Sequence, residues 1–276
     1  MKLSKNLLLS DDMPFAIEKR TFLKKNTMNE SHYHSHYELL YVLENERRLI
    51  VNNREYSLNS GTVALIALYT PHRTVAGDRS PETRILVNFT ESLVHPILDG
   101  MGVDFLSIFN PASPVLELSG NSDALKDMLL RLLDVSERED TPHREARCAL
   151  ILSDALFLLY GISGEGGHTR TFFDVTKYIE RHFAERITLD SLAKRFFMSK
   201  YTFLRKFKAH TGMGLPAYVN TIRLINAKAM LSSGAKVAEA AMACGFESLS
   251  NFDRVFRRET GMSPREYVNL AISNKA

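Results

Sequence analysis

The feature that most constrains the fold is an internal repeat within residues 187–268. Two stretches, residues 189–208 and 237–258, share one pattern: a short helical segment containing Ala, a turn, a Ser and a longer segment rich in Arg and Lys. Ser199 in the first copy corresponds to Ser248 in the second, and a Thr-Gly-Met sequence follows each copy. Serine caps helix N-termini and glycine closes helices, so each copy is predicted to be a helix-turn-helix motif.

Superimposing the two capping serines aligns the aromatic and basic positions of the two copies. The aligned pairs are Phe203 with Phe252, Arg205 with Arg254 and Phe207 with Phe256. Phenylalanines four residues apart lie on one face of a helix, so these four rings are expected in a hydrophobic core. A stacked array of repeats needs three or more copies and only two are present, so a pair of DNA-binding motifs is favoured over a solenoid.

Three stretches in and after the second copy complete the pattern: Ala241-Met-Ala-Cys-Gly-Phe246, Phe252-Asp-Arg-Val-Phe256 and Thr260-Gly-Met-Ser-Pro-Arg-Glu-Tyr267. With the spacing of the two motifs, residues 171–276 resemble the DNA-binding domain of the AraC/XylS family of bacterial transcription regulators. One departure is Phe197 in the first turn, where members of this family often carry Gly. The resemblance implies an all-α domain that binds promoter DNA, and it favours activation of transcription over repression.

The longer helix of each copy, which begins after Ser199 or Ser248, is the expected recognition helix. Its outward face supplies the candidate DNA-binding residues: Lys200, Tyr201, Leu204, Arg205, Lys208, Leu249, Ser250, Asn251, Arg254 and Arg257. The resemblance implies that Tyr201, Leu204 and Arg205 enter the major groove. An arginine there can bond both acceptors of guanine, which gives about 1–3 kcal/mol of discrimination. Other basic residues are expected to bind phosphates, and the alternative is that the arginines only solvate the surface.

Residues 215–231 are expected to form one helix between the two motifs, about 25 Å long at 1.5 Å per residue. That length would hold the recognition helices roughly one turn of DNA apart, which predicts binding to two adjacent major-groove segments. The charge distribution agrees, because the stretch from His168 to the C-terminus has 18 Lys and Arg against 9 Asp and Glu. The rest of the chain has 17 against 23. A basic module joined to an acidic one is typical of a DNA-binding domain attached to a sensor or partner domain.

Short apolar runs of strand length dominate the chain from about residue 15 to residue 89. Strands are expected at 38–43, 48–52, 55–58, 62–68 and 84–89, with a turn at Asn53 and Arg54. Many short strands at regular spacing predict a sandwich or barrel. The region resembles the cupin jelly roll that many members of the family carry as a sensor, and the predicted ligand-sensing domain spans residues 1–120.

A histidine-rich stretch, His32-Tyr-His-Ser-His-Tyr-Glu38, and the later His72 are the candidate ligand-binding residues of this domain. Residues 32, 34, 36 and 38 share one face of an extended strand, and similar sets of His and Glu converge inside metal-binding cupins. Three interpretations stay open for His32, His34, Glu38 and His72: a divalent first-row metal site, an organic-ligand pocket, or structural polar residues. The pocket is favoured, and no metal or other cofactor is assigned.

Helical periodicity replaces the strand pattern after residue 120. Apolar residues spaced three and four apart predict helices over 123–133 and 143–160, and the second is apolar around much of its circumference. Residues 121–160 are expected to form a dimerisation segment, with packing against the barrel as the alternative. Four glycines within residues 161–170 predict a flexible linker there, and the DNA-binding domain follows at 171–276.

Cysteine content and hydropathy restrict the class of protein further. Cys148 and Cys244 lie in different expected helices without metal-ligand spacing, so both are expected to be buried thiols. No uninterrupted run of about 18 apolar residues and no secretion signal stand out, so a cytoplasmic location is expected.

The complete prediction is an α+β protein with two domains, a cupin-like barrel followed by helices and an all-α domain with two helix-turn-helix motifs. Its predicted function is ligand-responsive transcription regulation without enzyme activity. Expected partners are promoter DNA, a small-molecule effector such as a carbohydrate, a second copy of the chain and, for an activator, RNA polymerase. Two alternatives stay open: a metal-dependent cupin enzyme with a DNA-binding domain, and a DNA-binding protein whose N-terminal domain only mediates oligomerisation.

Overall fold

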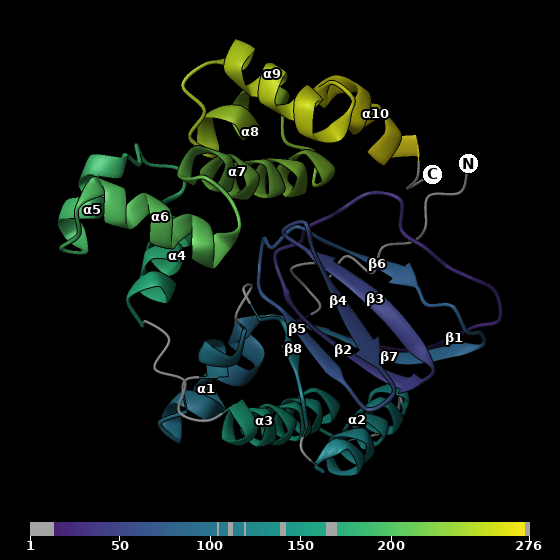
Figure 1. Ribbon diagram of the computed structural model, residues 1–276. Helices are drawn as coiled ribbons and strands as arrows, with labels where there is room; N and C mark the ends of the chain where they lie inside the picture. Colours follow the sequence, from purple (N-terminus) through teal and green to yellow (C-terminus); the bar gives the residue numbers. More distant parts are fainter. Residues whose placement is uncertain are drawn as a thin grey trace. The chain divides into compact units, whose positions relative to one another are not determined.

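The computed structural model describes residues 14–273, except 104, 110–112, 119, 139–141 and 164–169 and the side chains of 170–173 and 270–273 (Figure 1). The chain divides into two compact units, residues 1–168 and 169–276. In the described residues the first unit contains two sheets followed by helices, and the second unit contains helices only. The predicted α+β fold is therefore confirmed.

Two antiparallel sheets form the body of the first unit. The larger sheet has the strand order β1 (Phe15–Phe22), β7 (Glu82–Phe89), β2 (Tyr37–Glu44), β5 (Val63–Ile66) and β8 (Val115–Leu116). The smaller sheet has the order β4 (Arg54–Asn59), β3 (Glu46–Val51) and β6 (His72–Ala76). Each strand expected from the sequence is present, and β1, β6 and β8 are added to them.

The turn between β3 and β4 lies one residue earlier than expected. Val51 pairs with Arg54, which leaves Asn52 and Asn53 as the two loop residues, with φ angles of 51° and 63°. Asparagine tolerates this left-handed region, and two such residues suit the twist of a tight hairpin. Arg54 is therefore the first residue of β4 and not part of the turn, which corrects the expectation for Asn53 and Arg54.

Strand β2 is buried on both faces over most of its length, which explains its apolar run from Leu39 to Leu43. One face of β2 packs between the two sheets, where the core comprises Leu40, Val42, Leu49, Val51, Leu58, Ala64 and Ile66. On the other face the ring of Tyr37 lies 4.7 Å from that of Phe109 and the Tyr41 hydroxyl is 2.7 Å from Ser122 Oγ. This face of the larger sheet therefore packs against the segment that follows the strands.

Helices cover that outer face (Figure 1): α1 (Glu91–Gly100), the 3-10 helix η1 (Phe105–Ile108), α2 (Ser122–Glu137) and α3 (Arg144–Ser163). Helix α3 packs against α1, α2 and η1. By length and composition alone α3 could span a membrane, with a mean hydropathy of 1.5 over its most apolar window. Seven of its residues are buried in the unit, so its apolar character has an explanation in the packing.

The predicted linker at 161–170 is wrong at both ends. Gly161, Ile162 and Ser163 continue α3, and the Ser163 hydroxyl donates a hydrogen bond to the Tyr160 carbonyl at 2.8 Å. Glycine inside a helix costs about 1 kcal/mol, which the burial of α3 offsets. Arg170 already begins the next helix. The remaining linker residues, 164–169, lie outside the described residues.

The second unit is a series of helices: α4 (Arg170–His182), α5 (Leu189–Arg195), α6 (Lys200–Thr211), α7 (Leu215–Ser232), α8 (Val237–Ala243), α9 (Leu249–Thr260) and α10 (Pro264–Ser273). Both predicted caps are confirmed, because Ser199 Oγ accepts from the Thr202 amide and Ser248 Oγ accepts from the Asn251 amide. Gly212 and Gly261 close α6 and α9 in the left-handed conformation. The repeat read from the sequence is thus a structural repeat.

Candidate nucleic-acid interface and buried cavity

The inward faces of the two longer repeat helices, α6 and α9, anchor them to the core. Phe203 and Phe207 of α6 are fully buried and their rings stack 5.6 Å apart, while Phe252 and Phe256 of α9 are equally buried. The predicted core role of all four rings is confirmed. Cys148 and Cys244 are buried free thiols, also as predicted.

The outward face of α6 carries the candidate residues of the first motif. Tyr201 is 78% exposed, Leu204 is 41% exposed, and Arg205 and Lys208 are exposed as well. Lys200 forms an ion pair with Asp190 of α5 at 2.7 Å. The side chains of Arg205 and Lys208 have no hydrogen bond or salt bridge to any residue that the structure describes, so their charges are available to a partner.

The outward face of α9 carries the candidates of the second motif, and here the charges are paired. Leu249, Ser250 and Arg254 are exposed, and Asn251 is half-buried. Arg254 donates to the Asn251 side-chain oxygen at 2.9 Å, and Arg257 donates to Asp253 at 2.8 Å. A phosphate or a base that binds either arginine would therefore compete with this internal contact.

The turns that lead into α6 and α9 share one backbone conformation. Phe197 has a φ angle of 53° and Gly245 one of 78°, so both lie in the left-handed region. Phe197 is 96% exposed, whereas a Cβ added at Gly245 would lie 2.4 Å from the Ala184 carbonyl oxygen. The Phe at the first turn therefore keeps the helix-turn-helix geometry, and α5 ends just before it, at Arg195.

A cavity of about 210 Å³ lies in the first unit, lined by side chains from both sheets and from the stretch before β2. It brings together all four predicted pocket residues, His32, His34, Glu38 and His72. It also contains Arg47, Arg84 and Asn88, which the sequence reading missed. Strand alternation could have identified them. Arg47 lies two residues before the core residue Leu49 and shares its face, and Arg84 and Asn88 lie four residues apart on one face of β7.

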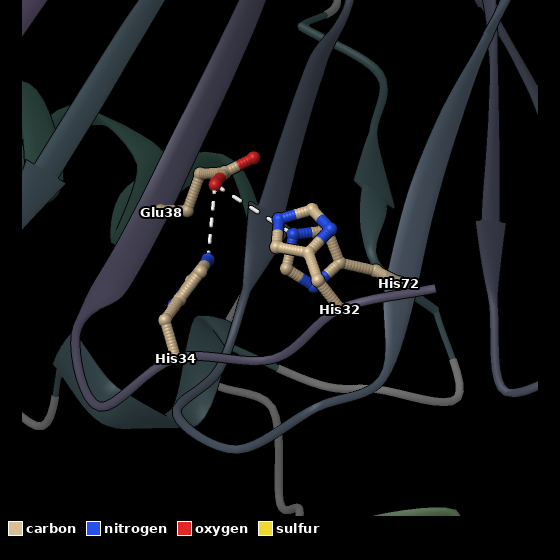
Figure 2. A group of neighbouring side chains, drawn as sticks. All are labelled: His32, His34, Glu38 and His72. Carbon is tan, nitrogen blue, oxygen red and sulfur yellow. Dashed lines mark hydrogen bonds and ion pairs between the residues drawn. The ribbon is translucent and has the colours of Figure 1, made fainter. Parts of the chain in front are cut away.

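Figure 2 shows how the four predicted residues converge. Glu38 Oε2 lies 3.1 Å from His34 Nε2 and 3.7 Å from His72 Nε2. His32 belongs to the stretch before β2, which forms a backbone bridge with β6: the amides of His32 and His72 each donate to the other's carbonyl at 2.9 Å. That bridge sets the His32 ring beside the His72 ring, with centroids 4.2 Å apart.

Burial and mutual contact determine the protonation of this group. Burial, assisted by the charges of neighbouring histidines, lowers the pKa of His32 to about 4 and that of His36 to about 3. Burial alone would raise the pKa of Glu38, but the contacts with His34 and His72 hold it well below its ordinary value. Burial opposes protonation of His72 as well, yet Glu38 raises its pKa. Glu38 is therefore a carboxylate at neutral pH.

Another part of the cavity lining is basic. Arg47 is 1% exposed, donates to Glu82, and also donates to Thr74 Oγ1 at 2.9 Å. Burial, together with the nearby charge of Arg47, lowers the pKa of Arg84 to about 10, so this side chain stays protonated at neutral pH. Arg84 Nε and Asn88 Oδ1 are buried without a hydrogen-bond partner among the described residues. Such groups in a cavity can serve a polar ligand.

Comparison with known proteins gives this arrangement a context. A model described as an AraC-like ligand binding domain matches residues 24–153, and one described as a helix-turn-helix domain matches residues 192–269. The HTH-type transcriptional activator RhaS of Enterobacter sp. (strain 638) is 27% identical over 271 residues, covering 93% of this chain and 92% of the relative. RhaS of Salmonella arizonae is 28% identical over 273 residues with the same coverage.

A solved structure supports the fold independently. ToxT from Vibrio cholerae matches 92% of this chain and 98% of its own with a TM-score of 0.57, at 14% sequence identity. The domain models match in the expected order and together cover more than half of the chain, and the relatives match along nearly their whole length. The protein belongs to the AraC/XylS family of DNA-binding transcription regulators.

Proposed function

We propose that a small molecule bound in the cavity of the first unit changes how the two helix-turn-helix motifs engage a promoter. The protein is a ligand-responsive DNA-binding regulator by family. The observation that carries the finer proposal is the cavity of about 210 Å³, in which the predicted residues His32, His34, Glu38 and His72 meet two arginines. Burying polar groups without partners costs free energy, so a purely structural core would not be expected to place so many of them around an open space.

The chemistry of the cavity favours a hydroxylated effector, and we propose a carbohydrate or a related polyol. Its lining offers acceptors at Glu38 and Asn88 and donors at Arg84, within reach of apolar surface from Leu40 and Leu86. A sugar presents hydroxyls that both donate and accept, together with apolar ring faces. A purely apolar ligand would leave the buried donors and acceptors unpaired, at about 1–3 kcal/mol each.

For the second unit we propose that the exposed faces of α6 and α9 enter two adjacent major-groove segments. The proposed contacts are Lys200, Tyr201, Leu204, Arg205, Lys208, Leu249, Ser250, Asn251, Arg254 and Arg257. Helix α7 has 18 residues and hence a length of about 27 Å, which suits the separation of two such segments. Arg205 supports this assignment best, because its guanidinium is exposed and has no partner among the described residues.

A homodimer is the proposed assembly, with α3 at its interface. Leu150 is 59% exposed and Phe157 is 46% exposed, and residues seven apart lie on one face of a helix. Two copies joined there would carry four DNA-binding motifs. As an activator the dimer would also contact RNA polymerase, and since promoter DNA is its target we place it in the cytoplasm.

The experiment that tests the sensor proposal combines two measurements on the full-length protein. Thermal melting is recorded with a panel of monosaccharides and polyols, because a ligand of the native state raises the melting temperature. Retention of genomic DNA fragments is then measured with and without each compound that raises it. The proposal expects at least one compound to change both. Stabilisation without any change in DNA retention would leave only a binding domain.

Catalysis by the cupin-like unit is the competing proposal. The relatives are named transcriptional activators, which favours regulation. Conversion of a stabilising compound into a product by the purified protein would support the enzyme instead.

A further inference from the structure

The side chains that converge in the cavity are all potential metal ligands. His32, His34, Glu38 and His72 each offer one ligand atom, and these atoms lie within 4.8 Å of one another (Figure 2). His34, Glu38 and His72 are buried and His32 is half-buried. Two nitrogens on opposite sides of an ion at about 2.1 Å are about 4.2 Å apart, so small side-chain rotations would bring the four atoms onto one ion.

Hydrogen bonds to the backbone fix the tautomers of two of these histidines. His34 Nδ1 lies 2.9 Å from the His36 carbonyl oxygen, and His72 Nδ1 lies 2.8 Å from the Thr70 carbonyl oxygen. A carbonyl oxygen only accepts, so each Nδ1 must carry the hydrogen. In the neutral imidazole the lone pair then sits on Nε2. This is the orientation that metal-binding histidines take, with the other ring nitrogen donating to a carbonyl or carboxylate.

Both Nε2 atoms lie near the same carboxylate oxygen. Glu38 Oε2 is 3.1 Å from His34 Nε2 and 3.7 Å from His72 Nε2. The shorter contact is a hydrogen bond, and an ion bound by both atoms would replace the proton between them. His72 Nε2 and His32 Nδ1 have no hydrogen-bond partner within the described part of the chain. A metal ion at the centre of this group would give both of these nitrogens a partner.

We propose that His32, His34, Glu38 and His72 bind one divalent first-row transition-metal ion. Three imidazoles and one carboxylate are a donor set that suits ions such as zinc, iron or nickel, and calcium and magnesium prefer oxygen ligands alone. The ion meets every lone pair at once, which a proton on a single imidazole does not. His36 supports the site from behind, since its ring lies flat against that of His34 at 3.9 Å.

The ion would lie at the wall of the cavity, because all four side chains line it. An effector with hydroxyl or carboxylate oxygens could then complete the coordination. This role rests on the proposed sensor function, whereas metal binding itself does not. The sequence left a metal site open without favouring it, and the two backbone hydrogen bonds that orient the imidazoles are the observation that favours it.

The test uses full-length protein stripped with a chelator, dialysed and titrated separately with Zn²⁺ and Co²⁺. Metal bound per chain is measured by elemental analysis, and the Co²⁺ sample is also followed by its visible absorption. The expected result is about one ion per chain and a higher melting temperature. His34→Gln and Glu38→Gln should each weaken binding by at least about tenfold. Both variants keep a polar side chain of similar reach, and their circular dichroism spectra and melting curves report folding.

The matched control is His95→Gln, which removes a half-exposed histidine of the same unit outside the cavity. It should bind metal like the unaltered chain. Loss of binding in the control equal to that in the cavity variants, or no stoichiometric metal in the unaltered chain, would overturn the proposal. Retention of promoter DNA and melting shifts with sugars are measured on the same samples, so failure of the metal site is distinguishable from failure of the sensor.

Discussion

The two helix-turn-helix motifs reach the same backbone with different residues and present different surfaces. The first motif, α5 and α6, turns through an exposed Phe197, and the second motif, α8 and α9, turns through Gly245 packed on Ala184. Arg205 of the first motif is free within the described residues, while Arg254 of the second is bonded to Asn251. Similar geometry therefore does not imply that the two motifs contribute equally to the proposed DNA binding. At the aligned arginine, the first motif offers an unpaired guanidinium within the described residues, whereas the second would have to give up the bond to Asn251.

The largest expected effect is a loss of stability when the glycine of the second turn is replaced. Gly245→Ala combines left-handed strain with a clash against the Ala184 backbone, and should lower the free energy of unfolding by about 2–5 kcal/mol. The control is Gly261→Ala, which has a similar φ angle of 74° but no atom within 4 Å of the added Cβ. It should lose only about 1–2 kcal/mol from strain. Urea unfolding of the full-length protein measures both losses. Equal losses would mean that the clash with Ala184 adds nothing to the cost of the substitution.

This contrast also shows what the sequence could and could not predict. Capping serines, closing glycines and inward phenylalanines are local patterns, so the order and the facing of the helices followed from them. The left-handed Phe197 could not be predicted, because a bulky residue reaches that conformation only where the surrounding structure imposes it. The resemblance to the AraC/XylS family expected Gly there, and the structure retains the turn without it.

The cavity residues likewise include some that the sequence could predict and some that it could not. His32, His34, Glu38 and His72 stood out because such residues recur in one short stretch and after a later strand. Arg47 and Arg84 were hidden in strands that read as core, although alternation puts both on inward faces. Whether an inward arginine faces packed core or open space depends on the distance between the sheets, and no local pattern encodes that distance.

The next largest effect concerns DNA recognition. Arg205→Ala should weaken binding to the preferred site by about 1–3 kcal/mol and relax the preference at one base pair. Arg254→Ala should cost less, since its guanidinium must first leave Asn251 at 2.9 Å. Binding to promoter fragments with single base-pair changes, at one fixed salt concentration, measures both. An equal loss on every sequence would identify Arg205 as a phosphate contact, and a larger loss for Arg254→Ala would reverse the order of the two motifs.

A pH-dependent effect is expected beneath the first motif. Burial raises the pKa of Glu180 to about 7, although Lys177 and the Tyr218 hydroxyl, which donates to Glu180 at 3.4 Å, oppose the shift. Between pH 4.5 and about 7 the folded state therefore holds a proton on Glu180 that the unfolded chain has already released, because the ordinary pKa of the carboxyl is 4.5. Stability should be greatest below about pH 4.5 for this group and fall as the pH rises to 7, by on the order of 1–2 kcal/mol after allowance for partial exposure.

Glu180→Gln isolates this contribution, because a neutral amide of the same shape does not titrate. The variant should flatten the dependence of unfolding free energy on pH between 5 and 8, and it should be more stable than the unaltered chain at pH 8. Tyr218 also packs edge-on against Phe207 of α6 at 5.3 Å, so the titrating group lies next to the first motif. An unchanged pH profile in the variant would assign the titration to another group.

The smallest effect is a gain in stability from Phe197→Gly. The left-handed conformation costs a non-glycine residue roughly 1–2 kcal/mol, and glycine removes that strain. Glycine also gives the unfolded chain more freedom, which takes back about 0.4–1 kcal/mol. Since the Phe197 side chain is 96% exposed, almost no packing is lost, and the net gain should be about 0.5–1 kcal/mol in urea unfolding. A loss of stability instead would mean that the ring makes contacts in solution. If DNA affinity also fell while stability rose, the exposed ring at the first turn would be part of the DNA-binding surface, and the difference between the two turns would be one of function as well as of backbone.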